Sequence, residues 1–300
     1  MKRVLALAAV LLISAAGLYL AQRRRQRDAV SANAVIDLTA NWQRDLTRAP
    51  MRLTRLSDRQ EIRIGDQLAQ QYLSAMPPLA PQMELVQSYV NSVGGRVASH
   101  AHRKLDYRFH LIPDAHYINA FALPGGHVFI GLGLLRQMTA EDELAFVLGH
   151  EIEHIDHYHA VGRVQMEAQL HKLDLDALAA VAQIPMSLWQ AGYSKNEEFE
   201  ADREGLRIAA AAGYSPQGAI DMLTRFLKLD RQYVSHAETP AGEMDQVVVE
   251  GLAGYFRSHP ETSERLAQAK QVIAEDHLQL TEPLTPLSGS LMKAAAPGPR

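Results

Sequence analysis

The chain has 300 residues, 47% of them hydrophobic, so it can bury a sizeable core. Cysteine is absent, which excludes disulfides, thiol nucleophiles and cysteine metal sites and leaves histidine, aspartate and glutamate as metal ligands. The formal net charge is -4, and the first 27 residues hold six of the 30 basic residues and no acid. The remaining chain is therefore acidic, which argues against a nucleic-acid partner.

The amino terminus has the form of a targeting segment. An uncharged run of 18 residues, Val4 to Ala21, lies between Lys2 and Arg3 on one side and four arginines on the other. This length suits a short membrane span or a long signal-peptide core. We expect residues 1–27 to be a signal peptide or, preferably, an uncleaved membrane anchor. Basic residues on both sides of the run leave its orientation in the membrane open. We expect a membrane-anchored or periplasmic protein, with the cytoplasmic face of the membrane as the alternative.

Helical signals begin after a polar stretch, residues 28–56, that we interpret as a linker. Ser57 is a suitable helix cap, with Gln60 in the first turn, and apolar residues then recur on one face until Pro77. A second helix is predicted over residues 83–98, where valines recur at helical spacing.

The periodicity then changes to that of strands. "DYRFHLIPD" (106–114) alternates apolar and polar residues, and "NAFALPGGHVFIGLGLL" (119–135) predicts two strands joined by a glycine turn. Asn119 and Gly125 to Phe129 could offer a strand edge to an extended peptide, although a purely structural hairpin explains them equally well.

Helices resume after the predicted hairpin. Thr139 precedes three acids within four residues, which is a favourable helix start, and helical patterning continues to about Ala274. Residues 276–300, rich in Pro, Gly and Ser, are expected to form a flexible tail. The sequence predicts one domain, residues 57–275, that is mainly α with a small β-hairpin or sheet (α+β).

The segment "GHEIEHIDHYHA" (149–160) holds the strongest chemical signal. His150 and His154 are four residues apart, so on a helix they lie on one face and can bind one zinc ion. Glu151 lies about 100° around the same helix and can reach a water molecule as general base. The alternative is an ordinary helix face with solvated histidines, so a third ligand is needed.

Candidates for that ligand lie in "SKNEEFEADREG" (194–205). Glu198 has Asp202 one helical turn later, so Glu198 can bind the metal while Asp202 accepts a hydrogen bond from a ligating histidine. Glu197 and Glu200 compete for the ligand role, and Glu200 has Glu204 at the same spacing. On spacing alone, Glu198 is favoured.

From about Ser57 to Ala274 the sequence resembles the M48 family of zinc metallopeptidases, in its Oma1-like and BepA-like group. The resemblance rests on five ordered segments: "SDRQEIRIG", "NAFALPGGHVFIGLGLL", "EDELAFVLGHEIEHIDHYH", "SKNEEFEAD" and "SHPETSERL". It implies a gluzincin-type fold with one zinc ion per chain on His150, His154 and Glu198.

Three further histidines lie in these segments, and the resemblance bears on two of them, His259 and His159. His259, in "SHPETSERL", would lie near the zinc as an oxyanion donor or a reversible fourth ligand, although from the sequence alone it is only a helix entry. His159 matches a histidine common in the family, and we interpret His157 and His159 as second-layer or solvent-facing residues.

The resulting expectation is a zinc metalloendopeptidase acting on unfolded or misassembled membrane and envelope polypeptides in protein quality control. Two alternatives stay open: a chaperone-like or adaptor protein with a latent zinc site, and a structural zinc protein with four closed ligands. An intact Glu151 favours the enzyme.

Overall fold

The computed structural model describes residues 56–173, 175, 181–182, 184, 188, 192–236, 259 and 262–287, all within the compact unit Pro50–Arg300. The expected anchor and residues 28–55 of the expected linker lie outside these residues, and none of the described helices is long and apolar enough to cross a membrane. The elements are α3 (Asp58–Ala75), α4 (Pro81–Ala98), β1 (Arg108–Ile112), β2 (Ala120–Leu123), η1 (Pro124–Gly126), β3 (His127–Gly131), α5 (Leu132–Leu135), α6 (Glu141–Asp156), α7 (His159–His171), α9 (Lys195–Ala211), α10 (Gln217–His236) and α12 (Thr262–Glu275).

The mainly helical fold with a small sheet confirms the predicted fold class. Both predicted early helices are present, and Ser57 and Gln60 form a capping box at the start of α3. The second helix begins two residues earlier than predicted, because Pro81 occupies its first turn, where a missing N–H costs nothing.

The sheet has the order β1-β3-β2, with β2 and β3 forming the predicted antiparallel hairpin and β1 lying parallel to β3. The turn depends on Gly125 and Gly126, whose φ angles of 76° and 106° favour glycine. Strand β3 is central and pairs with a strand on each side. The prediction that residues 125–129 offer a free strand edge is therefore wrong for residues 127–129, which belong to β3. The outer strands β1 and β2 form the edges of the described sheet.

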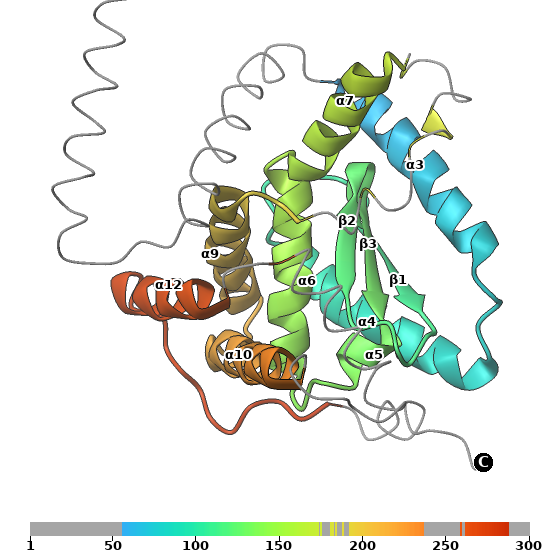
Figure 1. The fold of residues 1–300 in the computed structure, drawn as a ribbon. Coiled ribbons are helices and arrows are strands. Elements are labelled where there is room, and N and C mark those ends of the chain that lie inside the picture. The colour runs from blue at the N-terminus through green and yellow to red at the C-terminus, as the bar shows by residue number, and fades with distance from the viewer. Residues whose placement is uncertain are drawn as a thin grey trace, which may run out of the picture. The chain divides into compact units, whose positions relative to one another are not determined.

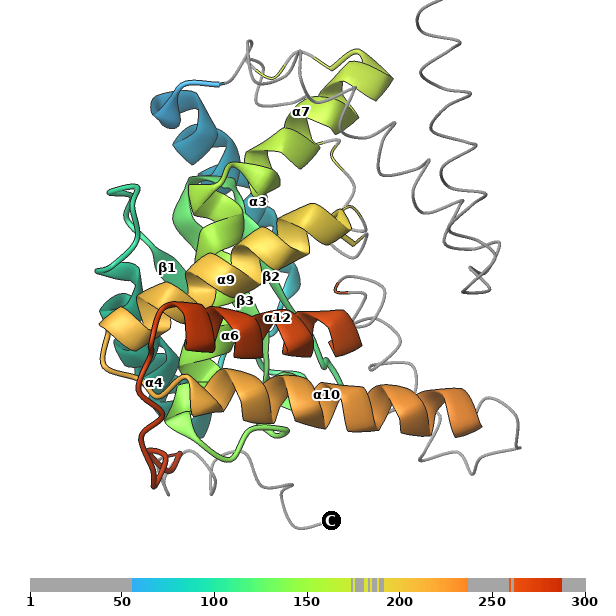
Figure 2. The ribbon, with the colours of Figure 1, turned by 90° about the vertical axis from the view of Figure 1, so that its left-hand side faces the viewer.

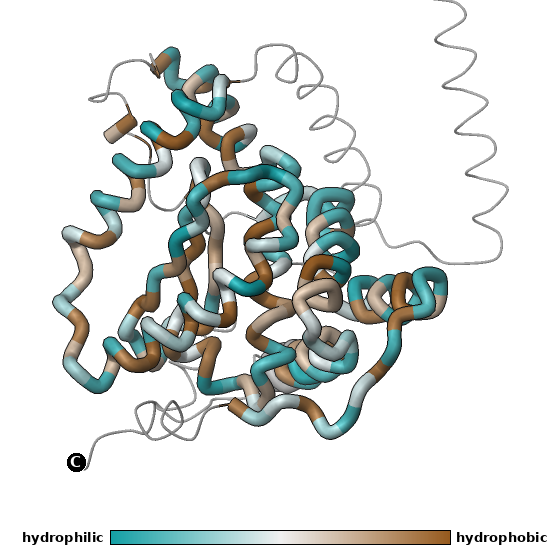
Figure 3. The backbone as a smooth tube through the Cα atoms, turned by 180° about the vertical axis from the view of Figure 1, so that it is seen from behind, coloured by the Kyte–Doolittle hydropathy of each residue, from teal (hydrophilic) through white to brown (hydrophobic). Residues whose placement is uncertain are grey.

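Helix α6 lies at the centre of the described fold. It packs against α9 and α10 on one side and against α4 and β2 on the other (Figure 1). Viewed from that first side, α9, α12 and α10 form a layer over it (Figure 2). All 16 residues of α6 are buried, its acids and histidines included. Hydrophilic and hydrophobic stretches are interspersed along the backbone of the described fold (Figure 3).

The start of α6 differs from the prediction. The capping residue is Ala140, while Thr139 donates its backbone N–H and its hydroxyl to the Glu143 carboxylate. Part of the expected tail also contacts this end, since Glu141 N–H donates to Thr285 O at 2.7 Å and Leu287 is buried. These contacts fix the described part of the tail against α6, while the domain boundaries stay a prediction.

Two glycines set the distance between α6 and α9. A Cβ on Gly149 would lie 2.6 Å from Gly205 O, and one on Gly205 would lie 2.6 Å from the backbone N of His150. Such separations are too short for a carbon atom, so only glycine allows the two backbones to approach this closely.

We expect Gly205→Ala to destabilise the protein by about 1–3 kcal/mol, because the overlap with α6 outweighs the better helix propensity of alanine. Urea unfolding measures the change. Gly95→Ala, in α4, is the matched control: nothing lies within 4 Å of the added Cβ, so this variant should gain about 0.5–1 kcal/mol. A Gly205→Ala variant as stable as wild type would contradict the role of this contact.

Candidate metal centre

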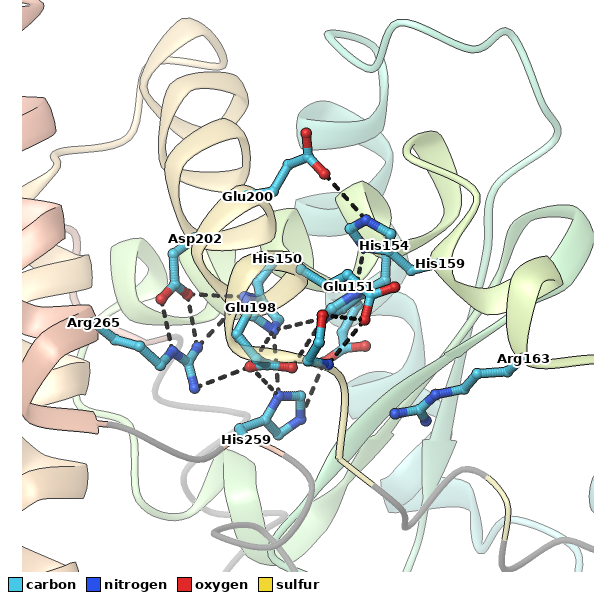
Figure 4. A network of polar contacts seen from close by, with 12 residues as sticks. His150, Glu151, His154, His159, Arg163, Glu198, Glu200, Asp202, His259 and Arg265 are labelled. Atoms are coloured by element: carbon cyan, nitrogen blue, oxygen red, sulfur yellow. Dashed lines mark hydrogen bonds and ion pairs between the residues drawn. The ribbon is translucent and has the colours of Figure 1, made fainter. Parts of the chain in front are cut away.

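The two histidines of the H-E-x-x-H motif meet on one face of α6. His150 and His154 are 3% and 0% exposed, and their Nε2 atoms lie 3.1 Å apart (Figure 4). Since residues four apart lie one helical turn from each other, the helix itself produces this convergence.

Helix α9 brings Glu198 to the same point. Its Oε1 lies 3.5 Å from His154 Nε2 and its Oε2 lies 3.6 Å from His150 Nε2. The two competing carboxylates are elsewhere: Glu197 accepts hydrogen bonds from the backbone and hydroxyl of Ser194 at 2.8 Å, and Glu200 contacts His159. Of the three predicted candidates, only Glu198 contacts both histidines.

His259 completes the cluster from a distant part of the sequence. Its Nδ1 lies 3.0 Å from Glu198 Oε2 and 3.3 Å from His150 Nε2, and the residue is 3% exposed. His150, His154, Glu198 and His259 each offer one ligand atom within 4.8 Å of the others. The predicted helix entry at Pro260 lies outside the described residues.

The spacing of these atoms fits a tetrahedral metal ion. Zinc bonds of about 2.0–2.1 Å place neighbouring ligand atoms of a tetrahedron about 3.3–3.4 Å apart. The two imidazole nitrogens lie 3.1 Å apart, and they lie 3.5 and 3.6 Å from different carboxylate oxygens of Glu198, which are distances close to that value. Burial lowers the pKa of His154, which favours the neutral form of the ring that can bind a metal. For Glu198, burial raises the pKa, but His259, His154 and Arg265 outweigh it and lower the pKa, which favours the carboxylate.

Glu151 lies beside the cluster with unused hydrogen-bonding capacity. It is 1% exposed, its Oε1 lies 3.7 Å from His259 Nε2, and its Oε2 accepts no hydrogen bond from the described part of the chain. Burial raises the pKa of this carboxyl group. A higher proton affinity suits a group that must take up and release a proton near neutral pH.

Asp202 contacts the outer nitrogen of His150, at 2.9 Å between Oδ1 and Nδ1. Arg265 of α12 donates from Nε to Asp202 Oδ2 at 2.6 Å and from Nη2 to Oδ1 at 2.7 Å, and its Nη1 lies 3.4 Å from Glu198. Arg265 was not predicted from the sequence. The sequence marks this arginine only by its place in the segment of His259, six residues further along the chain.

The other two histidines behave differently from each other. His157 is partly exposed and pairs with Glu153, at 2.9 Å between Nδ1 and Oε2. His159 is 8% exposed and contacts the outer nitrogen of His154.

Tyr193 also lies against the cluster and was not predicted from the sequence. It stacks on the His154 ring with 3.7 Å between ring centroids, and no pattern in its segment of the sequence indicates this contact.

A buried helix that presents two histidines four residues apart, with a glutamate from a later helix, is compatible with a gluzincin-type metallopeptidase centre. Residues 84–273 match the model of peptidase family M48, and the chain belongs to this family. The recognised resemblance is thereby confirmed.

Two groups of relatives are similar to this chain. The beta-barrel assembly-enhancing protease of Escherichia coli (strain K12) is 31% identical over 192 residues, covering 57% of this chain and 38% of the relative. The mitochondrial metalloendopeptidase OMA1 of Bos taurus is 36% identical over 126 residues, covering 36% of this chain and 24% of the relative. The chain thus matches well under half the length of each of these two relatives.

We expect Arg265→Met to destabilise the protein by about 3–5 kcal/mol, because it leaves the buried Asp202 carboxylate without its bidentate partner. Urea unfolding of the metal-free protein measures the loss. Arg207→Met is the matched control: Arg207 pairs with Asp276 at the surface and should contribute no more than about 1 kcal/mol. Equal losses of unfolding free energy in the two variants would show that the buried Arg265–Asp202 pair stabilises the protein no more than the surface pair.

Proposed function

We propose that this chain is a zinc-dependent endopeptidase that binds one zinc ion through His150, His154 and Glu198. The observation that carries the proposal is the buried convergence of these three side chains, with the Glu151 carboxyl group beside them. Membership of peptidase family M48 supports a metal-dependent peptidase. The donor set of two imidazoles and one carboxylate, without sulfur, is typical of catalytic zinc sites.

A zinc ion held there would supply Lewis-acid polarisation of a carbonyl group and lower the pKa of water to about 7. Glu151 acts as the general base: it takes a proton from the attacking water and passes it to the leaving amine. Its buried position and raised pKa suit both transfers. Asp202 holds the ring of His150 in a fixed orientation through Nδ1.

His259 has two possible roles in this proposal. Through Nε2, which faces Glu151, it can donate a hydrogen bond to the oxyanion that develops during hydrolysis. Through Nδ1, which lies within 3.3 Å of both Glu198 and His150, it can close the fourth position around the metal. The second role favours the alternatives without catalysis: a structural zinc protein with four closed ligands, or a chaperone-like or adaptor protein with a latent zinc site.

We further propose that the substrates are unfolded or misassembled membrane or envelope polypeptides. Support comes from the relatives, which are named for beta-barrel assembly enhancement and for a mitochondrial location. The apolar segment at residues 4–21 would attach the enzyme to a membrane, in a periplasmic or, alternatively, cytoplasmic orientation.

We expect Glu151→Gln to retain one bound zinc per chain and to lose at least about 100-fold in casein cleavage, because proton transfer is removed while the ligands are intact. Zinc content and cleavage are measured on the same preparation. Glu167→Gln is the matched control, since Glu167 pairs with His171 on α7 away from the cluster and should keep full activity. Full activity of Glu151→Gln would contradict the proposed mechanism.

His259→Ala separates the active enzyme from the latent site. If His259 donates to the oxyanion, its removal lowers cleavage while zinc stays bound. If it closes the fourth position, its removal raises cleavage from a low basal rate. Zinc binding without any cleavage, in both wild type and His259→Ala, would contradict the protease and favour the adaptor.

A further inference from the structure

His159 links the candidate metal ligand His154 to a carboxylate that faces the surface. Its Nδ1 lies 3.0 Å from Nδ1 of His154, and its Nε2 lies 3.2 Å from Oε2 of Glu200 (Figure 4). The three side chains come from α6, α7 and α9, and they form an unbroken line of contacts from Glu200 to the centre of the cluster.

When His159 is neutral, the carboxylate fixes the position of each hydrogen atom along this line. A carboxylate only accepts hydrogen bonds, so the contact with Glu200 requires the hydrogen of His159 to be on Nε2. A neutral imidazole carries one such hydrogen, so Nδ1 of His159 is a bare acceptor. It accepts from Nδ1–H of His154, and the Nε2 of His154 is therefore bare and faces His150 and Glu198.

We propose that Glu200, acting through His159, fixes the tautomer and ring orientation of His154, so that both are positioning residues for the metal centre. This inference rests on the proposed function, in which His154 binds zinc through Nε2. In the free side chain the hydrogen distributes between both ring nitrogens, and only the form with a bare Nε2 can bind the metal from this side.

The two histidines of the motif are thus held by different means. His150 contacts a buried carboxylate directly, at 2.9 Å from Asp202. His154 reaches its carboxylate only through a second imidazole, and the Glu200 side chain is 38% exposed. Metal-binding histidines generally donate their outer N–H to such a group, and losing it typically costs 10–100-fold in metal affinity.

The backbone between α6 and α7 is shaped for this contact. His159 follows His154 by five residues, a spacing that would place it on another face of a continuous helix. Tyr158 instead adopts φ 62°, an unfavourable left-handed conformation for a bulky residue, and this turns the chain so that α7 begins at His159. Arg103 stabilises the turn, stacking over the Tyr158 ring at 4.0 Å and donating to Ile155 O at 2.9 Å.

Zinc affinity of the full chain, measured by competition with a chelator, tests the proposal. His159→Phe keeps a ring but removes the acceptor, and should weaken zinc binding about 10- to 100-fold. His159→Gln retains a carbonyl acceptor and should restore part of the affinity, and Glu200→Ala should cause a smaller loss because water can replace a half-exposed carboxylate. Because Glu200 acts only through His159, the double variant His159→Phe, Glu200→Ala should bind zinc as His159→Phe does.

The control is His157→Phe, because His157 also lies near Glu200, at 3.7 Å, and the structure shows no contact between it and His154 among the described residues. Its zinc affinity should equal that of wild type. Cobalt-substituted protein adds a second readout: the visible spectrum should change in His159→Phe and not in His157→Phe. Thermal unfolding of the metal-free variants shows whether a loss comes from unfolding.

Wild-type zinc affinity in His159→Phe, or losses that simply add in the double variant, would overturn the relay and leave the proposed function intact. Absence of zinc binding by the wild type would instead overturn the proposed function itself. A cobalt spectrum that is identical in wild type and His159→Phe would also contradict the proposal, since His154 would then not depend on His159.

Discussion

Helix α6 is buried on every side, and this burial determines how the other described elements pack around it. The helix is rich in acids and histidines, so each charged group needs a partner inside the protein. Glu141 is bonded by the hydroxyls of Tyr89 and Tyr214, and Asp142 by the backbone N–H groups of Ser215 and Thr285. Segments far apart in the sequence are therefore held around one helix by its polar groups as well as by its apolar ones.

The candidate metal centre extends the same principle to the middle of the helix. The glycine contact between α6 and α9 brings His150 and Glu198 close, and Arg265 of α12 balances the buried negative charge of Asp202. Without a cation, the lone pairs of these nitrogen and oxygen acceptors would repel one another, since the Nε2 atoms of His150 and His154 face each other at 3.1 Å. A bound cation resolves this conflict, which is why the polar interior favours a metal site.

Features that depend on local spacing were predictable from the sequence. The H-E-x-x-H helix, the glycine hairpin and the Ser57 cap each need only a few neighbouring residues. The parallel pairing of β1 with β3, the carboxylate-binding role of Arg265 and the contact between His159 and Glu200 join segments far apart in the chain. Spacing contains no signal for such contacts, and the left-handed turn at Tyr158 broke the helical periodicity on which the assignment of His159 relied.

Zinc X-ray absorption on the purified full chain, combined with metal analysis, shows whether the buried cluster of His150, His154 and Glu198 is a metal centre. We expect one zinc per chain, surrounded by nitrogen and oxygen ligands at about 2.0–2.1 Å with the multiple-scattering signature of two or three imidazoles. His150→Ala and His154→Ala should each reduce that signature or abolish binding. A chain that binds no zinc, or a zinc spectrum unchanged by these substitutions, would contradict the assignment of the buried cluster as a metal centre.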